Sequence, residues 1–359
     1  MLAYLSYPSW ITPEIIPGFP VRWYGLMYLF AFATTFILAI YQLKKRKRSG
    51  ISAKKDPLIR MSTDDLVNLF LWLIIGLLLG ARLFATLIYD PSGYYFSHPW
   101  MIFWPFRDGR FVGLLGMSYH GGVVGAVVGG LLFARRHRYN FFQLADLIIA
   151  GVPLGYTFGR LGNFFNGELW GRVTARSWGM VFPYAESFSS KYEWVREIAG
   201  RIGMPYQEGA MVNLPRHPSQ LYEACFEGVF LWLIIWFIVR QRKKFHGQII
   251  SIYIMGYGLI RFFIEYFREP DADLGFVFSF GAGSESTALL LSFWNFSMGQ
   301  VLSSIMIAAG AVLYLLLRKR YSADMRSVKG GRGKFSGATA GKGPSRKLTG
   351  RNVKGSRKR

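Results

Sequence analysis

The sequence predicts an all-α polytopic membrane protein with seven transmembrane helices and a small head domain outside the membrane. Three observations lead to this fold class. The 359 residues are 52% hydrophobic and yet carry a net charge of +23, and their mean hydropathy is positive, a combination that soluble domains of this size rarely show. Seven apolar runs are long enough to cross a bilayer, and basic residues gather after every second run.

The apolar runs define the predicted spans. A helix that crosses the bilayer needs roughly 20 mostly apolar residues. Runs of this kind cover residues 24–43, 66–88, 112–134, 144–163, 219–239, 248–267 and 298–317. The chain shows no repeat of fixed period and no inverted pair of broken helices of the kind that builds transporters.

The basic clusters predict how these spans are oriented. Lys and Arg gather after the first, third, fifth and seventh runs, at residues 44–48, 135–138, 240–244 and 318–320. Because cytoplasmic loops carry the excess of Lys and Arg, these alternate loops are expected inside the cell. The N-terminus is then outside and the C-terminus inside. The loops at 89–111, 164–218 and 268–297 face outward, and the middle one is long enough for the head domain.

The two ends of the chain differ in character. Residues 1–20 have no basic region ahead of an apolar core, so we do not expect a cleaved signal peptide. We assign residues 1–320 to the membrane domain and 321–359 to a basic cytoplasmic tail. From Arg318 onward there are 15 Lys or Arg and one acid, Asp324. We expect this tail to be disordered, without a nucleic-acid partner, and either drawn to anionic lipid or merely solvated as a topology signal.

Cysteine usage limits the chemistry. The single cysteine, Cys225, lies inside the fifth apolar run, which excludes a disulfide framework and a cysteine metal site. We expect no metal and no cofactor. Thiol chemistry would therefore need the thiol of a partner.

Ionisable residues inside the spans mark the candidate chemistry, because such groups cost several kcal/mol unless they are paired or solvated. Most of them lie toward the outward ends. Arg261 and Glu265 stand four residues apart and can form an internal ion pair. Arg160 has no acid within a turn of its own helix, and an unpaired arginine at this interface suits a phosphate. The full set is Arg82, His120, Asp146, Arg160, Glu223, Glu227, Arg261 and Glu265.

His120 opens the third span in a glycine-rich context. Gly121, Gly122 and Gly125 allow close approach of a second helix or a lipid. The histidine is either a satisfied core residue or a group that accepts a proton from a reacting atom, since imidazole titrates near neutrality. Further polar residues stand at other span ends and predict a site built from several helices: Tyr24, Ser219, Gln220, Glu223, Arg268 and Asp271.

These motifs resemble those of the prolipoprotein diacylglyceryl transferases. The resemblance covers about residues 20–320 and implies a bacterial inner-membrane enzyme with its active site toward the periplasm. It implies phosphatidylglycerol as donor, the lipobox cysteine of a prolipoprotein signal peptide as acceptor, a thioether product and release of glycerol 1-phosphate. The residues that carry it are Trp23–Tyr28, His120–Gly122, Gly159–Arg172, Arg216–Glu223, Arg261, Glu265 and Arg268.

The resemblance also implies roles for individual residues. Arg160, with Asn163 and Arg261, would bind the phosphate of the donor. His120 is the first choice of general base, with Tyr24 or Glu265 as alternatives. Glu168 and Arg172 form either an ion pair or an anchor for the head. The wider polar network comprises Asp146, Asn166, Glu168, Gly171, Arg172, His217, Ser219, Gln220, Glu223, Glu265 and Arg268.

Two other classes compete with this interpretation. Buried charged residues also mark ion paths, so a transporter or channel is the main rival. The clustering of polar groups at the outer span ends, in place of a continuous path, disfavours it. A membrane scaffold would not need so many unpaired polar groups. The basic tail and the loops at 89–111 and 268–297 depart from the family pattern.

Overall fold

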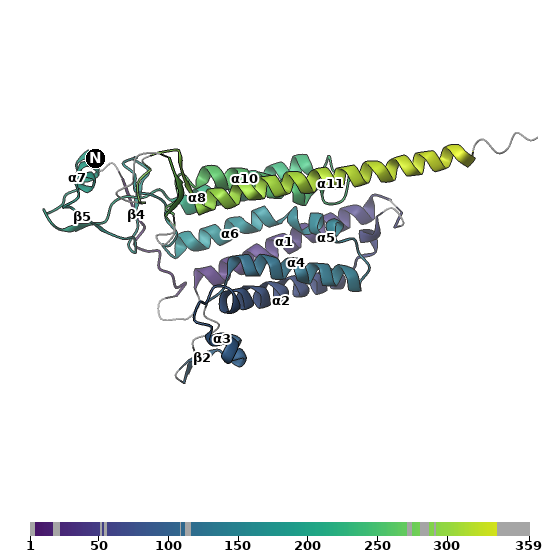
Figure 1. Cartoon of the computed structure of the whole chain (residues 1–359), viewed down its shortest axis with the longest axis horizontal. Coiled ribbons are helices and arrows are strands. Elements are labelled where there is room, and N and C mark those ends of the chain that lie inside the picture. Colours follow the sequence, from purple (N-terminus) through teal and green to yellow (C-terminus); the bar gives the residue numbers. More distant parts are fainter. Residues whose placement is uncertain are drawn as a thin grey trace, which may run out of the picture. The chain divides into compact units, whose positions relative to one another are not determined.

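The structure is a computed structural model that describes residues 4–16, 22–50, 52–53, 56–107, 109–111, 116–270, 275–280, 287–290 and 292–335. Its helices and strands are shown in Figure 1. The helices are α1 (Trp23–Arg48), η1 (Pro57–Arg60), α2 (Thr63–Leu87), α3 (Tyr94–Ser97), η2 (Pro99–Ile102), α4 (Tyr119–Arg136), α5 (Phe141–Ile149), α6 (Val152–Phe165), α7 (Glu193–Arg201), α8 (Ser219–Glu223), η3 (Ala224–Phe230), α9 (Leu231–Leu233), η4 (Ile234–Val239), α10 (Gln248–Ile264) and α11 (Met298–Phe335). The strands are β1 (Leu5–Ser6), β2 (Phe106–Arg107), β3 (Arg110–Phe111), β4 (Met180–Val181), β5 (Phe188–Ser189), β6 (Met211–Val212), β7 (Phe276–Ser279) and β8 (Asn295–Ser297).

Helices lie over all seven predicted runs, and the chain is a polytopic membrane protein. Four helical stretches are long and apolar enough to cross a membrane, namely α1, α2, Ser219–Val239 and Met298–Ala323. A fifth candidate is the bent pair α5 and α6. The remaining two runs hold shorter helices: α4 begins at Tyr119 rather than at residue 112, and α10 ends at Ile264.

The predicted fourth span is broken in the middle. The axes of α5 and α6 differ by 50°, with Ala150 and Gly151 between them. Pro153 stands in the first turn of α6, where its missing N–H costs nothing, but the same residue cannot donate a hydrogen bond back into α5. The break therefore starts a new helix N-terminus within the apolar run, and α6 carries Arg160 and Asn163 at its far end.

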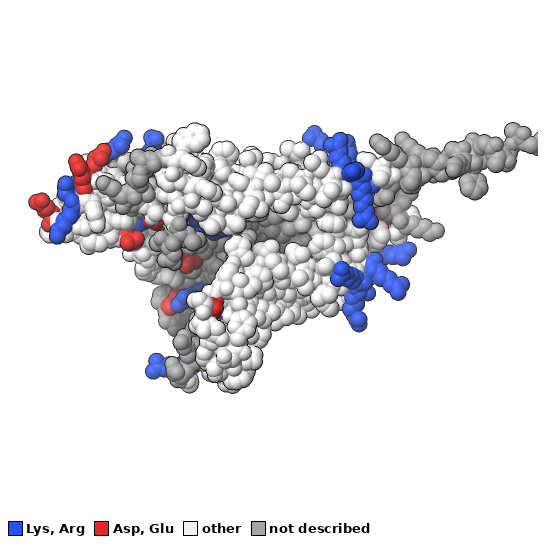
Figure 2. Space-filling model, viewed as in Figure 1, with Lys and Arg blue, Asp and Glu red and all other residues white. Residues whose placement is uncertain are grey.

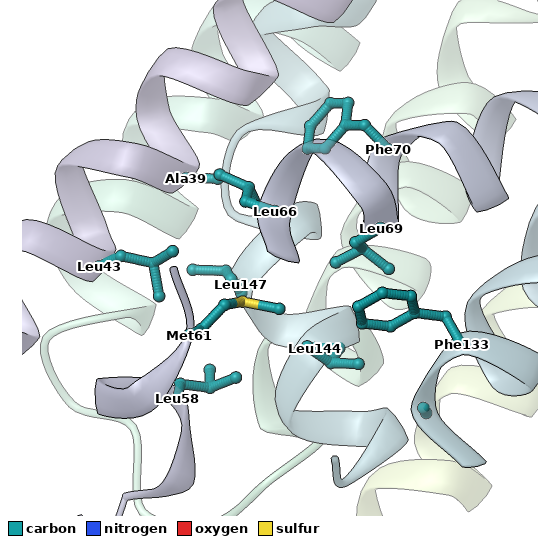
Figure 3. Packing of buried hydrophobic residues seen from close by; sticks show 11 residues of the cluster. Ala39, Leu43, Leu58, Met61, Leu66, Leu69, Phe70, Phe133, Leu144 and Leu147 are labelled. Atoms are coloured by element: carbon teal, nitrogen blue, oxygen red, sulfur yellow. The ribbon is translucent and has the colours of Figure 1, made fainter. Parts of the chain in front are cut away.

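A compact core joins the helices at the basic end of the bundle. Side chains from α1, η1, α2, α4 and α5 point toward one another there, as Figure 3 shows for Leu58, Met61, Leu66, Leu147 and their neighbours. All four of these side chains are at most 1% exposed. Burial of a leucine or methionine of this kind contributes about 1.5–3 kcal/mol, so this cluster fixes how the helices are joined.

Polar contacts tie the basic loops together at the same end. Asp56 binds Arg46 at 2.5 Å between Oδ2 and Nη1, and its Oδ1 accepts from Gln143 Nε2 at 2.6 Å. Lys243 binds Asp146 at 2.8 Å. The loops after the first and fifth apolar runs are therefore fastened to the α5 region by buried acids.

The glycines of α4 pack against α2. A Cβ added to Gly125 would lie 2.0 Å from the carbonyl oxygen of Gly76, and one added to Gly80 would lie 2.2 Å from that of Gly121. Only glycine allows the two backbones to approach this closely. Of the two expected uses of these glycines, approach of a second helix or of a lipid, the structure shows the helix, because α4 packs against α2 (Figure 1).

The head contains more of the chain than residues 164–218. It holds α7 and the antiparallel pair β5–β6, and Val195, Val212 and Leu214 belong to its core. The N-terminal strand β1 pairs in parallel with β4, with Leu5 opposite Met180. Ala288, from the last outward loop, is 1% exposed in the same core. Three segments that are far apart in sequence therefore build the head.

On the face seen in Figure 2, Lys and Arg gather at one end of the helices, further charged side chains lie on and near the head, and the surface between these groups is mostly uncharged. Helices α1, α2 and α4 expose aliphatic side chains, among them Leu29, Ile37, Leu71, Ile75 and Val127. Such an apolar surface is expected where lipid replaces water as the solvent.

The last helix continues past the predicted start of the tail. The chain divides into two compact units, Met1–Leu317 and Arg318–Arg359. Helix α11 continues to Phe335, so the predicted boundary at residue 321 falls inside a helix. Residues 336–359 and Asp271 lie outside the described residues.

The α2–α4 contact generates a first prediction. Gly125→Ala should lower the apparent Tm of the purified protein, because its methyl group collides with backbone; overpacking of this kind costs about 1–3 kcal/mol. Gly200→Ala in α7 is the control, since its Cβ meets nothing within 4 Å. Equal Tm values for the two variants in thermal unfolding would show that the helices are not packed this closely.

Candidate active site

The carboxylate of Glu223 stands at the centre of the polar cluster. Its Oε2 lies 2.7 Å from Nε of Arg160, and its Oε1 lies 3.3 Å from Nη1 of both Arg261 and Arg268. The three arginines come from α6, α10 and the residues that follow α10. Glu223 is 1% exposed, whereas the arginine side chains are about 15% exposed. One buried anion thus gathers three cations that are themselves partly exposed.

Arg261 is surrounded by carboxylates. Besides Glu223, its Nη1 lies 3.6 Å from Oε1 of Glu227, and its Nη2 lies 3.2 Å from Oε2 of Glu265. The predicted pairing of Arg261 with Glu265 is therefore present, but it is one of three. Ser297 also donates to Glu265 Oε1 at 3.1 Å, so this acid is held on two sides.

The prediction that Arg160 is unpaired is wrong. Its own helix supplies no acid, as the sequence indicates, but Glu223 reaches it from the fifth apolar run. The Nε atom also donates to the Tyr156 hydroxyl at 2.5 Å. Among the described residues, the hydrogen bond to an Arg160 Nη atom is a long one, from Nη1 to Asn163 Oδ1 at 3.4 Å. The outer edge of this guanidinium is thus available for a ligand.

Two tyrosines extend the cluster into the bundle, and the sequence prediction missed both. The Tyr156 hydroxyl donates to the Glu227 carboxylate and lies 3.4 Å from the Tyr257 hydroxyl. Each tyrosine precedes a cluster arginine by four residues, Tyr156 before Arg160 and Tyr257 before Arg261. That spacing places both pairs on one helical face, and it is the signal that could have identified them.

The segment after α6 forms a tight polar loop. Glu168 accepts from Asn163 Nδ2 at 2.9 Å and from Asn166 Nδ2 at 3.4 Å. Leu169 follows in a left-handed backbone conformation with φ of +58°. A non-glycine residue held in this region costs about 1–3 kcal/mol. The loop therefore needs outside support, and its two asparagines and Glu168 act as its internal frame.

Ser219 and Gln220 supply that support from the start of α8. The Ser219 hydroxyl donates to the Leu169 carbonyl at 3.0 Å, and Gln220 Nε2 donates to the Glu168 carbonyl at 2.6 Å. Both side chains are 0% exposed. These two side chains therefore contact the neighbouring loop.

Arg172 joins the head to the last outward loop. Its Nη1 donates to the Thr287 and Leu289 carbonyls at 2.6 and 3.0 Å. No ion pair with Glu168 is among the described contacts, so of the two predicted roles the anchor is observed. Gly171 makes this packing possible, because a Cβ there would lie 2.2 Å from the Phe267 carbonyl oxygen.

His217 lies on the head side of the cluster. Its Nδ1 is 3.1 Å from the Tyr222 hydroxyl. Burial, and to a lesser extent the charge of Arg176, lower the pKa of His217 to about 4. The ring is therefore neutral at physiological pH. Its neighbour Arg216 is fully buried and pairs with Glu269, which fastens the chain ahead of α8.

Tyr24 and His120 stand beside the cluster, without a described hydrogen bond to its arginines. The Tyr24 hydroxyl is 2.9 Å from that of Tyr28, and Tyr28 lies within electrostatic range of Arg160. His120 is exposed, with Nδ1 at 2.9 Å from the Tyr89 hydroxyl. The preceding residue, Tyr119, lies within electrostatic range of Arg160 and Arg261, so the start of α4 faces the cluster.

Asp146 does not join this network, contrary to the prediction. Its carboxylate accepts from the backbone N–H groups of Gly247 at 2.7 Å and Ile250 at 3.0 Å, and it pairs with Lys243. An acid at a helix N-terminus satisfies free N–H groups there. Arg82 also serves structure, since it donates to the Ile102 carbonyl and, at 3.2 Å, to that of Gly116.

The geometry defines what the cluster can do chemically. Three guanidinium groups around a buried acid keep their orientation without a ligand and present donors to the exposed side. Such a preorganised arrangement in a low-dielectric site stabilises a phosphate on which charge is growing. The exposed His120 and the Tyr24–Tyr28 pair are the candidate proton acceptors.

Comparison with known proteins agrees with this chemistry. Residues 11–316 match the family model described as prolipoprotein diacylglyceryl transferase. The phosphatidylglycerol–prolipoprotein diacylglyceryl transferase of Treponema denticola is 50% identical over 327 residues, which cover 88% of this chain and 95% of the relative. That of Treponema pallidum is 50% identical over 85% of this chain and 93% of the relative. That of Borrelia garinii is 40% identical over 88% and 94%.

The central carboxylate generates a second prediction. Glu223→Gln leaves three guanidinium groups without their shared counter-charge and should destabilise the protein by about 3 kcal/mol, the lower end for removing one partner of a buried ion pair. Glu197→Gln, on the exposed side of α7, should be close to neutral. Thermal unfolding of both variants checks this, and an unchanged Tm for Glu223→Gln would contradict it.

Proposed function

The chain belongs to the prolipoprotein diacylglyceryl transferase family, and from this premise and the geometry of the arginine cluster we propose that it transfers the diacylglyceryl group of phosphatidylglycerol to the lipobox cysteine of prolipoproteins. The observation that carries the proposal is the contact of Arg160, Arg261 and Arg268 with the buried Glu223. This is the first lipid-attachment step of lipoprotein maturation, and it takes place in the bacterial inner membrane.

We propose seven spans with the N-terminus in the periplasm, the C-terminus in the cytoplasm and the active site toward the periplasm. Support comes from the basic loops after α1 and η4, which contact the α5 region through Asp56 and Asp146 and so share one end of the bundle. Positively charged loops mark the cytoplasmic side. The arginine cluster and the head are on the opposite side, where a lipobox cysteine leaves the membrane.

Arg160 is the main ligand of the donor phosphate in this proposal. Its Nε is held by Glu223 and Tyr156, so the planar group is oriented before lipid arrives. The outer Nη atoms can then bind two phosphate oxygens, the geometry that makes arginine suited to phosphate. Arg261 assists by its charge, since three carboxylates occupy much of its donor edge. Asn163 orients the Arg160 side chain.

The reaction joins sulfur to carbon and releases a phosphate monoester. The thiolate of the acceptor attacks the glyceryl carbon that carries the phosphate, the C–S bond forms and the C–O bond breaks. The electron pair leaves with the phosphate oxygen as glycerol 1-phosphate, and the thiol proton passes to a base. A free thiol has a pKa near 8.5, so only a few per cent is ionised at neutral pH, and a base therefore speeds the step.

His120 is the proposed base. When its Nδ1–H donates to the Tyr89 hydroxyl, Nε2 carries the free electron pair and can accept the thiol proton. The ring is exposed, so a substrate thiol can reach it. Glu265 is a poorer choice, because Arg261 and Ser297 hold its oxygens. Tyr24 remains an alternative through its hydrogen bond with Tyr28.

Both substrates are amphipathic, and we propose that they enter sideways from the membrane. Figure 2 shows the surface hollowed between the part that carries α2 and α4 and the part that carries α10 in the view of Figure 1. The buried cluster around Leu66, Phe133 and Leu147 joins α2 and α4 to α1 and α5 at the basic end. Lipid would enter between the outer ends of these helices, where α4 carries His120 and α6 carries Arg160.

A transporter is the alternative that the contacts disfavour. An ion path needs polar groups through the whole membrane depth. Here Asp146 and Lys243 pair with each other at one end, and the arginine cluster lies at the other. Apolar residues such as Leu231, Ile235 and Ile249 pack between them.

The reaction itself can be tested with purified protein, labelled phosphatidylglycerol and lipobox peptides that carry cysteine or serine. We expect label on the cysteine peptide alone, because sulfur is the nucleophile. In the same assay Arg160→Ala and Arg261→Ala should abolish transfer, and both variants should still insert into membranes. If the wild-type protein transferred label to neither peptide, the result would favour the transporter alternative. Normal turnover by both variants would refute the phosphate assignment.

The proposed base has its own test. His120→Gln should lower kcat by about 100-fold or more, the usual contribution of general base catalysis, and should remove the fall in activity at acidic pH. Tyr89→Phe keeps the ring of the hydrogen-bond partner without its hydroxyl and should cause a smaller loss. If His120→Gln retains most activity together with the acidic limb of the pH profile, the histidine is not the base.

A further inference from the structure

A cavity of about 430 Å³ lies between the head and the residues that follow α10. Its volume is within the range of ligand pockets. Its walls combine two arginines with aromatic rings, and none of its described lining residues is acidic. The residues that matter here are Arg172, Arg176, Trp178, His217, Tyr266 and Phe293.

One polar group of this wall has no partner. Arg172 is 2% exposed, and its Nε has no hydrogen-bond acceptor among the described residues, although its Nη1 is bound to two carbonyls. Burial lowers the pKa of Arg172 to about 10, so it stays charged at neutral pH. A buried, charged donor without an acceptor is costly, and with Arg176 this residue gives the wall of the cavity a positive charge that favours oxygen atoms of a ligand.

The cavity is close to the reacting centre. Phe267, which also lines it, accepts from the Arg172 backbone N–H at 2.9 Å. The next residue in the chain is Arg268, which contacts Glu223. His217, on another wall, accepts through its carbonyl from the Gly171 N–H at 2.8 Å. A chain whose thiol stands at the cluster could therefore reach this cavity within a few residues.

We propose that this cavity binds the polypeptide segment that follows the acceptor cysteine; this inference rests on the proposed transfer reaction. The carbonyl oxygens of an extended peptide suit the positive charge of Arg172 and Arg176, and its side chains suit the rings of Trp178, Tyr266 and Phe293. A lipid fits less well, because the cavity lies on the head side of the arginine cluster, where the segment after the cysteine would leave the membrane. The head would thus contribute to recognition of the acceptor.

Two lipobox peptides test the proposal, one that ends at the cysteine and one that continues beyond it. Arg176→Gln and Phe293→Ala should each raise KM for the longer peptide by about tenfold, a loss usual for an important interface side chain. KM for the shorter peptide, KM for phosphatidylglycerol and kcat should not change. Arg201→Gln, an exposed arginine of the head, is the matched control and should behave as wild type.

Binding of the fluorescently labelled longer peptide, measured by anisotropy, separates this inference from the reaction. Weaker binding by Arg176→Gln and Phe293→Ala supports the inference even if no transfer occurs, in which case the proposed function fails alone. Unchanged binding and unchanged KM for the longer peptide overturn the inference while transfer persists. A rise in KM for phosphatidylglycerol with both peptides also overturns it, since the cavity would then hold lipid.

Discussion

The contact between one buried carboxylate and three guanidinium groups is the constraint on which the outer half of this protein depends. Glu223 lies at the start of the fifth apolar run and holds Arg160, Arg261 and Arg268 within 3.3 Å. Three arginines at such distances would repel one another in a medium of low dielectric constant. Since their shared partner is fully buried and they are not, the cluster remains intact without substrate and still offers donors to it.

The rest of the fold positions this cluster from two sides. At the basic end, apolar packing and the buried acids Asp56 and Asp146 fasten the helices to one another. At the other end, the loop after α6 is held by Ser219 and Gln220 despite the strained backbone of Leu169. Because the fourth apolar run is broken into α5 and α6, it contributes Asp146 to the basic end and Arg160 to the arginine cluster. The residues of the candidate site thus lie where helices end, as is common for sites that are carried on a rigid scaffold.

Much of this arrangement could be predicted from the sequence, because it depends on periodicity and residue type. Apolar length predicted a helix over each of the seven runs, and the cost of charge in a membrane identified Arg160, Glu223 and Arg261. What the sequence could not provide was pairing between helices: Arg160 has no acid on its own helix, and its partner is 63 positions away in the chain. For the same reason Asp146 was assigned to the polar network of the site, whereas it pairs with Lys243 at the basic end. The head was underestimated because β1 and Ala288 join it through contacts that no local pattern reveals.

The most direct measurement is a structure of the protein with phosphatidylglycerol bound. The account predicts phosphate oxygens at about 2.7–2.9 Å from the Nη atoms of Arg160, with Glu223 still on the inner side of that guanidinium and the glyceryl carbon open toward His120. A phosphate held at the basic end beside Lys243, or an Arg160 that leaves Glu223 and turns away from the lipid, would contradict it.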